Sequence, residues 1–241
     1  MVYIRCQSSK IAPLGLITGD PGRVEHMAAE LQDVQSVCRN REYIVVTGTY
    51  QGTPVTIASG GIGAPSTAIA LHELAQYGMR AIVRIGTNMG VDAPLRSVVI
   101  STGAARFDGT SPRYLPLNYP AVPDWELTQA LAAAGTQHDL DVRLGPTASY
   151  DAFYPDMAPS VVGHGALDLT EARRADVLSM DMETSLVLVL GRVLKMKTAA
   201  MCLVTVQAEP HIHLENDERA DLEHRVIRAA LDGLVRFGKA D

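Results

Sequence analysis

Cysteine is scarce in this chain of 241 residues, which holds only Cys6, Cys38 and Cys202. An odd number of cysteines without a Cys-x-x-Cys pair argues against a disulfide framework and against a cysteine-based zinc site. Such usage is typical of proteins from a reducing compartment, so we expect a cytoplasmic protein. A chain of this length can bury a substantial hydrophobic core without covalent cross-links.

Positively charged residues are outnumbered, with 21 Lys and Arg against 27 Asp and Glu, and the net charge is −6. General nucleic-acid binding requires a basic surface, so the composition argues against it. Long apolar runs are missing as well, and none approaches the roughly 18–20 residues that span a membrane. The N-terminal residues lack the apolar stretch of a signal peptide. No linker or low-complexity tract interrupts the chain, and we expect one domain over residues 1–241.

The apolar runs that remain are short and alternate with segments of helical periodicity. We predict strands at residues 14–18, 43–50, 54–59, 81–85, 98–102, 142–149, 177–182 and 198–206. We predict helices from residue 21 and over residues 66–77, 125–134, 184–194 and 217–237. This alternation indicates an α/β fold with a largely parallel sheet, which the hairpin at 43–59 makes mixed. The proline-rich stretch 107–123 predicts a long functional loop.

Several polar clusters follow the predicted strands, at the sheet edge where ligands of α/β proteins gather. The first is GDPGR at residues 19–23, a strand-to-helix turn that begins with Gly19 and ends with Arg23. Backbone N–H groups at a helix N-terminus and one guanidinium group suit a phosphate or a carboxylate. The same residues also fit a simple turn with a surface arginine, and this alternative stays open.

Arg84 stands inside the apolar run AIVRIG, where a charged side chain is costly unless it is paired or lines a site. Thr87 adds a hydroxyl group at the end of the same predicted strand. The alternative to a binding site is a buried salt bridge, for example to Glu73 or Asp20.

Glu183 lies in SMDMET at residues 179–184, where a strand is expected to meet a helix. A carboxylate that faces a pocket can accept two hydrogen bonds from a vicinal diol, each worth about 1.5–3 kcal/mol. The alternative is a helix cap formed by Glu183 or Thr184.

Other motifs carry weaker signals. The GGIG turn at residues 60–63 lacks the complete dinucleotide-binding pattern, because Ser66 occupies the last glycine position. His211 and His213, near Glu215, have no third ligand close in sequence, so we expect no metal site. Cys202 lies in an apolar run and is expected in the core.

Six segments keep a common order over nearly the whole chain: GDPGR at 19–23, NREY at 40–43, GGIGAPST at 60–67, RIGTNMG at 84–90, TASYDAFY at 147–154 and MDMETS at 180–185. Together they resemble the nucleoside phosphorylase-I family, the branch of the hexameric bacterial purine nucleoside phosphorylases and the uridine phosphorylases. The resemblance implies a three-layer αβα fold with a mixed, mostly parallel central sheet. It also implies a salvage enzyme that uses phosphate, without a cofactor, to cleave a nucleoside into the base and an α-(deoxy)ribose 1-phosphate.

The resemblance also implies roles for individual residues. The phosphate would be bound by Gly19, Arg23, Arg84, Thr87 and, from a neighbouring subunit, Arg41. The ribose would be bound by Met182, Glu183 and a neighbour's Tyr3, and the base would lie beside Phe153. Uridine phosphorylases can also hold a potassium ion between subunits, at positions that match Glu42, Ile62 and Ser66. A homo-oligomer is therefore expected, and the family arrangement is a hexamer built as a trimer of dimers.

Three positions depart from the family pattern. Tyr3 stands in place of a histidine that reaches the ribose 5′-hydroxyl group. Met157 and Pro159 fall where uridine phosphorylases read uracil with a glutamine and an arginine. Ala208 stands where the purine enzymes place an acid or an asparagine. Gln207 or Glu209 could supply that contact after a shift of one residue.

These departures favour a purine-preferring phosphorylase over a uridine phosphorylase, which remains an alternative. Leaving-group help from a general acid is worth about 10²–10⁴-fold in rate. A catalytically weak nucleoside-binding protein of the same fold is therefore a further alternative. A hydrolytic nucleosidase would have no need for the anion-binding arginines. The candidate catalytic residues are Arg84, Glu183 and Glu209, with Gln207 and Glu209 also expected at the base.

Overall fold

The computed structural model describes residues 2–5, 10–152 and 169–240. The expectations for Phe153, Met157 and Pro159 lie outside these residues. Among the helices described, none combines the length and the apolar character that crossing a membrane requires.

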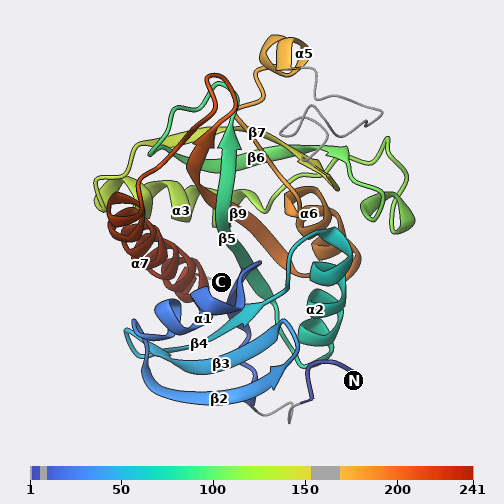
Figure 1. Ribbon diagram of the computed structural model, residues 1–241. Coiled ribbons are helices and arrows are strands. Elements are labelled where there is room, and N and C mark those ends of the chain that lie inside the picture. The colour runs from blue at the N-terminus through green and yellow to red at the C-terminus, as the bar shows by residue number, and fades with distance from the viewer. Residues whose placement is uncertain (1, 6–9, 153–168, 241) are drawn as a thin grey trace.

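A 10-stranded sheet forms the centre of the molecule, in the order β10-β9-β6-β7-β8-β5-β1-β4-β3-β2 (Figure 1). The strands are β1 (Leu14–Thr18), β2 (Gln32–Asn40), β3 (Tyr43–Tyr50), β4 (Thr53–Ser59), β5 (Ala81–Gly90), β6 (Val98–Phe107), β7 (Val142–Tyr150), β8 (Ser179–Asp181), β9 (Lys197–Gln207) and β10 (Ile212–His213). The strand β5 pairs in parallel with β1 and β9, whereas its last residues pair antiparallel with β8. The sheet is therefore mixed, as the hairpin predicted.

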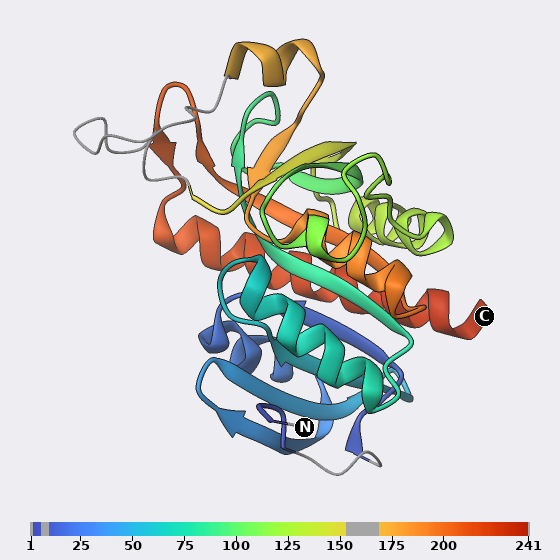
Figure 2. The same ribbon diagram turned by 90° about the vertical axis from the view of Figure 1, so that its right-hand side faces the viewer.

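Helices cover both faces of this sheet and give three layers. They are α1 (Pro21–Ala28), α2 (Ala64–Gln76), α3 (Trp125–Gln137), α5 (Leu169–Arg174), α6 (Thr184–Val193) and α7 (Asn216–Ala240). One hydrophobic core lies between the sheet and α1, α3 and α7, and a second lies between the sheet and α2 and α6. Figure 2 shows α7, in red, on the opposite side of β5 from α2, in teal.

The turn between β1 and α1 shows how the sequence produces the local structure. Pro21 occupies the first turn of α1, where its missing N–H group has no intrahelical partner to lose. The Asp20 side chain caps this helix by accepting a hydrogen bond of 2.8 Å from the Gly22 backbone N–H. The predicted strand at 14–18 and the helix from residue 21 are both confirmed.

The strands β5 and β6 continue beyond their predicted ends, to Gly90 and Phe107, whereas β8 is shorter than predicted. The edge strand β2 was not predicted, because most of its side chains are exposed and it carries no apolar alternation. The short helix Ser111–Arg113 lies within the stretch that the sequence predicted as a loop.

Candidate active site

A cavity of about 290 Å³ opens beside the ends of β1 and β8 and along β5. It is lined by Gly19, Asp20, Arg23, Ile62, Arg84, Gly86, Thr87, Asp181, Met182 and Glu183. Four of the five residues expected at phosphate line this cavity, and so do Met182 and Glu183, which were expected at ribose. The sheet topology explains why these residues lie together, because β1 and β5 are parallel neighbours and β8 pairs with the last residues of β5.

Arg23 projects from the first turn of α1 toward α7. Its Nη2 atom lies 3.1 Å from Oε1 of Glu223, and the same oxygen accepts a hydrogen bond of 2.8 Å from Nε of Arg219. The half-buried Arg23 is therefore held at the cavity wall by the last helix of the chain. The sequence did not predict this contact, which joins residues 200 positions apart.

Arg84 is 6% exposed and contacts three side chains from two other elements of the sheet and from the residue before α6. Its Nη1 donates a hydrogen bond of 2.7 Å to Sγ of Cys202, and its Nη2 lies 3.0 Å from Oδ2 of Asp181 and in contact with Oε2 of Glu183. These partners replace the two that the sequence suggested for a salt bridge. Arg84 is thus ion-paired and also forms part of the cavity wall.

The suggested partners of Arg84 lie elsewhere. Glu73 accepts hydrogen bonds from the backbone N–H groups of Val2, Tyr3 and Ile4, and Asp20 caps α1. Both carboxylates therefore accept hydrogen bonds from backbone N–H groups, Glu73 from the N-terminal segment and Asp20 from its own turn.

The neighbours of Arg84 stabilise its positive charge in spite of burial. Burial acts to lower the pKa of the Arg84 guanidinium, but Cys202, Asp181 and Glu183 raise it above its ordinary value. Burial raises the pKa of the Cys202 thiol to about 11, so the sulfur is a neutral thiol at neutral pH. Gly86 leaves the space that the guanidinium group fills, because a Cβ there would collide with Nη1 of Arg84. The site therefore presents a permanent cation at the cavity wall.

Glu183 immediately precedes α6, and its carboxylate does not cap that helix. Its Oε1 instead accepts a hydrogen bond of 2.6 Å from the backbone N–H of Gly63, and its Oε2 contacts Arg84. Gly63 has φ +89°, a conformation that favours glycine and directs its N–H at the carboxylate. The predicted alternative of a cap formed by Glu183 is therefore wrong, and the carboxylate faces the cavity.

Asp181 was not predicted at the site, although it is 2% exposed and lines the cavity. It accepts hydrogen bonds from Oγ of Ser149 at 2.6 Å and from the backbone N–H of Thr184 at 3.1 Å. The signal for it was present in the sequence. An acidic residue in a short apolar strand is as costly as Arg84 in its own strand, so the same reasoning applies to both.

Arg41 and Tyr3 lie together at the surface. Neither residue is among those that line the cavity within the described chain. The Arg41 guanidinium carbon is 5.4 Å from the centre of the Tyr3 ring, which also packs on Tyr43. Oγ of Ser66 donates a hydrogen bond of 3.2 Å to Oε1 of Glu42, and Ile62 is exposed at the cavity rim. The potassium expectation for Glu42, Ile62 and Ser66 remains a prediction.

Gln207 is the last residue of β9, and Glu209 lies two residues after it; neither is among the described residues that line the cavity. Nε2 of Gln207 donates a hydrogen bond of 3.3 Å to the Gly90 carbonyl oxygen. The exposed Glu209 forms an ion pair of 2.9 Å with Nη1 of Arg173 on α5. Their expected contacts with the base remain predictions. His211 and His213 contact each other, and no group of three metal-binding side chains exists in the part of the chain that the structure describes.

Residues 13–236 match the family model of the phosphorylase superfamily. The chain belongs to this family. It is 34% identical to the guanosine phosphorylase of Halorubrum lacusprofundi, over 97% of this chain and 93% of the relative. It is 38% identical to the uridine phosphorylase of Treponema pallidum, over 96% of this chain and 92% of the relative.

Solved structures agree with this assignment. The uridine phosphorylase of Vibrio fischeri superimposes with a TM-score of 0.86 at 26% identity, over 99% of this chain and 96% of that chain. The predicted fold, family and kind of enzyme, a nucleoside phosphorylase, are confirmed.

Proposed function

We propose that the protein is a nucleoside phosphorylase that prefers purine nucleosides and releases the base and an α-(deoxy)ribose 1-phosphate. The observation that supports this most is the single cavity that joins Arg23, Arg84 and Thr87 to Met182 and Glu183. Cationic side chains at one end suit inorganic phosphate, and a carboxylate beside them suits a sugar diol.

The reaction needs little beyond positioning and charge. Phosphate would lie between the N-terminus of α1, Arg23 and Arg84, with one oxygen aimed at C1′ of the ribose. A bond from that oxygen to C1′ forms while the bond from C1′ to the base nitrogen breaks, and the base leaves with the electron pair and takes up a proton. Glu183 would hold the ribose hydroxyl groups so that the attack is in line. We propose that phosphate is the co-substrate and that no other cofactor takes part.

The charges around the cavity support a contribution from a second subunit. The described lining carries two guanidinium groups, of Arg23 and Arg84, and three carboxylates, of Asp20, Asp181 and Glu183. Phosphate adds about 1.5–2 negative charges near neutral pH. These groups together leave an excess of negative charge, and the exposed Arg41 of a neighbour would reduce it.

We therefore propose a homo-oligomer, a hexamer built as a trimer of dimers, in which Arg41 reaches the phosphate of a neighbouring site. Tyr3 lies against Arg41 and would enter the same site beside the ribose 5′-hydroxyl group. Both side chains lie near the surface of the subunit, as such a role requires.

The preference for purines rests on the base end of the site. Met157 and Pro159 lack the hydrogen-bonding groups that read uracil, and Glu209 offers an acid one residue from the expected position. A uridine phosphorylase is the second candidate, because relatives from Treponema pallidum and Vibrio fischeri bear that name.

A panel of inosine, guanosine, adenosine and uridine, assayed with and without phosphate, tests the proposal. We expect cleavage to require phosphate and kcat/KM to be at least about tenfold higher for the best purine than for uridine. Faster cleavage of uridine would select the second candidate. Cleavage that proceeds equally without phosphate would overturn both.

A further inference from the structure

The two carboxylates that contact Arg84 differ in how they are held. We infer that Asp181 is a positioning residue that keeps Arg84 directed at phosphate, whereas Glu183 exchanges its contacts to bind the ribose. The inference rests on the proposed function, since it divides the cavity between the two substrates. It gives a role to a buried side chain that the reaction itself does not use.

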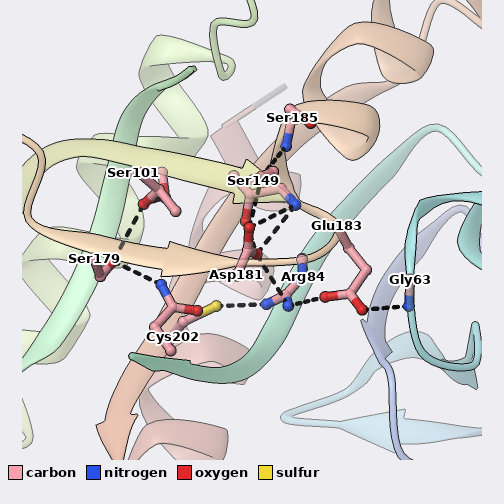
Figure 3. Close-up of polar contacts among 12 residues, drawn as sticks. Gly63, Arg84, Ser101, Ser149, Ser179, Asp181, Glu183, Ser185 and Cys202 are labelled. Carbon is pink, nitrogen blue, oxygen red and sulfur yellow. Dashed lines mark hydrogen bonds and ion pairs between the residues drawn. The ribbon is translucent and has the colours of Figure 1, made fainter. Parts of the chain in front are cut away.

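Asp181 receives hydrogen bonds from two elements besides its contact with Arg84 on β5 (Figure 3). Oδ1 accepts from Oγ of Ser149, at the end of β7, at 2.6 Å. Oδ2 accepts from the backbone N–H and from Oγ1 of Thr184, the first residue of α6, at 3.1 and 2.5 Å. The positive N-terminal end of α6 also favours a carboxylate at this position. The side chain is buried, and turning it further toward the cavity would break these hydrogen bonds.

The donors to Asp181 are themselves held in place. Oγ of Ser149 accepts a hydrogen bond of 2.9 Å from the backbone N–H of Ser185. Oγ of Ser185 in turn donates to Oδ2 of the buried Asp108 at 2.5 Å. Asp108 also accepts from the backbone N–H and the hydroxyl group of Ser111. A network of buried hydrogen bonds therefore fixes Asp181 relative to β7 and α6.

Glu183 has a different environment. Its contacts in the described chain are the Gly63 N–H, from the turn before α2, and Arg84. Figure 3 shows its carboxylate between these two groups. A ribose diol that donates to Glu183 must compete with these contacts. When Glu183 turns to the ribose, Asp181 remains in contact with Nη2 of Arg84 and keeps the guanidinium group in place.

The Asp181→Asn variant removes the charge but keeps the shape of the side chain. We expect the KM for phosphate to rise about tenfold or more, which is the scale of one hydrogen bond to a charged group. The KM for the nucleoside should change by less than about threefold, because Glu183 is unchanged. Glu183→Gln should show the opposite pattern.

Asp124→Asn is the matched control. Asp124 is also a buried, ion-paired carboxylate that accepts a hydrogen bond from the first turn of a helix, α3, but it does not line the cavity. If the effect came only from the loss of a buried, helix-capping carboxylate, the two variants would raise the KM for phosphate equally. Titration calorimetry of the full chain with inorganic phosphate gives a second readout that is independent of turnover.

The expected result is a loss of phosphate affinity in Asp181→Asn that Asp124→Asn does not share. Equal phosphate affinities in the two variants would overturn the inference. If Asp181→Asn does not fold, Ser149→Ala, which removes a donor to Asp181 and leaves the ion pair, replaces it. We then expect a rise in the phosphate KM of about threefold, and an unchanged value would overturn the inference.

The two failures are distinguishable. A failure of the proposed function appears in the wild-type protein, as nucleoside cleavage that does not depend on phosphate. A failure of the inference appears as a phosphate-dependent wild type whose Asp181→Asn variant keeps its phosphate affinity.

Discussion

The two ends of the candidate active site differ in how their side chains are held. At the proposed phosphate end, Arg84 is buried and contacts three side chains, and Arg23 is paired with Glu223. At the proposed base end, Glu209 is exposed and forms an ion pair with Arg173 on the short helix α5. The proposed reaction uses the same phosphate and a similar pentose whichever base the nucleoside carries, so a rigid end can serve every substrate. The base differs between nucleosides, and selection of it falls to the less constrained end.

The largest effect is expected at the phosphate end, from Arg84→Met. Loss of the buried cation should lower kcat/KM by about 10³-fold or more, measured as release of the free base. It should also destabilise the fold by about 3–5 kcal/mol, because Asp181 and Glu183 remain buried without their cation. Arg96→Ala, which breaks an exposed ion pair with Glu218, is the control and should leave both quantities nearly unchanged. A loss of activity below tenfold in Arg84→Met would contradict the central role of this side chain.

The next effect is expected where the phosphate end meets the ribose, from Glu183→Gln. The amide keeps the size of the side chain but weakens the hydrogen bonds that a ribose diol would donate. We expect the KM for the nucleoside to rise about 10- to 100-fold, while the KM for phosphate changes by less than about threefold. Initial rates over a grid of both substrates give the two constants separately. Equal changes in both constants would mean that Glu183 serves phosphate as much as ribose.

A smaller effect is expected from Arg41→Ala, which tests whether the phosphate end is completed by a neighbour. The KM for phosphate should rise about tenfold, because one charged contact is lost. Arg39→Ala is the control, since Arg39 lies two residues before Arg41, on the edge strand β2, and pairs with Glu25. Co-expression of Arg41→Ala with Arg84→Met should restore sites that contain both wild-type arginines. Mixed oligomers no more active than either parent would argue against a contribution from the neighbour.

The smallest effect is expected at the base end, from Glu209→Gln. We expect kcat for the best purine nucleoside to fall about tenfold and kcat for uridine to change by less than about twofold. The exposed Glu215, close by in sequence, supplies the control variant Glu215→Gln. A purine rate as high as in the wild type would remove Glu209 from the site and leave Gln207 as the candidate.

The sequence predicted several of the residues that line the cavity but not the contacts that hold them. Gly19, Arg23, Arg84, Thr87, Met182 and Glu183 stand in ordered motifs, and the structure brings them to one cavity. The pairing of Arg84 with Asp181, Glu183 and Cys202 could not be predicted, even though each residue stood out in the sequence or its motif, because the pairing depends on the registers of β8 and β9 against β5. Glu223 could not be predicted either, because α7 reaches Arg23 through tertiary packing alone.

The fold was predicted where burial imposes a pattern. The buried strand β1 reads as a continuous apolar run, and its predicted bounds were those observed. The edge strand β2 carries polar residues and was missed, because only its pairing with β3 makes it a strand. Local sequence thus predicts the elements that form the core and fails for those that depend on a neighbouring strand.

The fate of the phosphate tests the central claim most directly. Phosphorus NMR of a reaction with inosine and inorganic phosphate follows it without any variant. We expect the orthophosphate signal to fall and an α-ribose 1-phosphate signal to rise in equal amount with the free hypoxanthine. Release of hypoxanthine and free ribose with an unchanged phosphate signal would contradict the account.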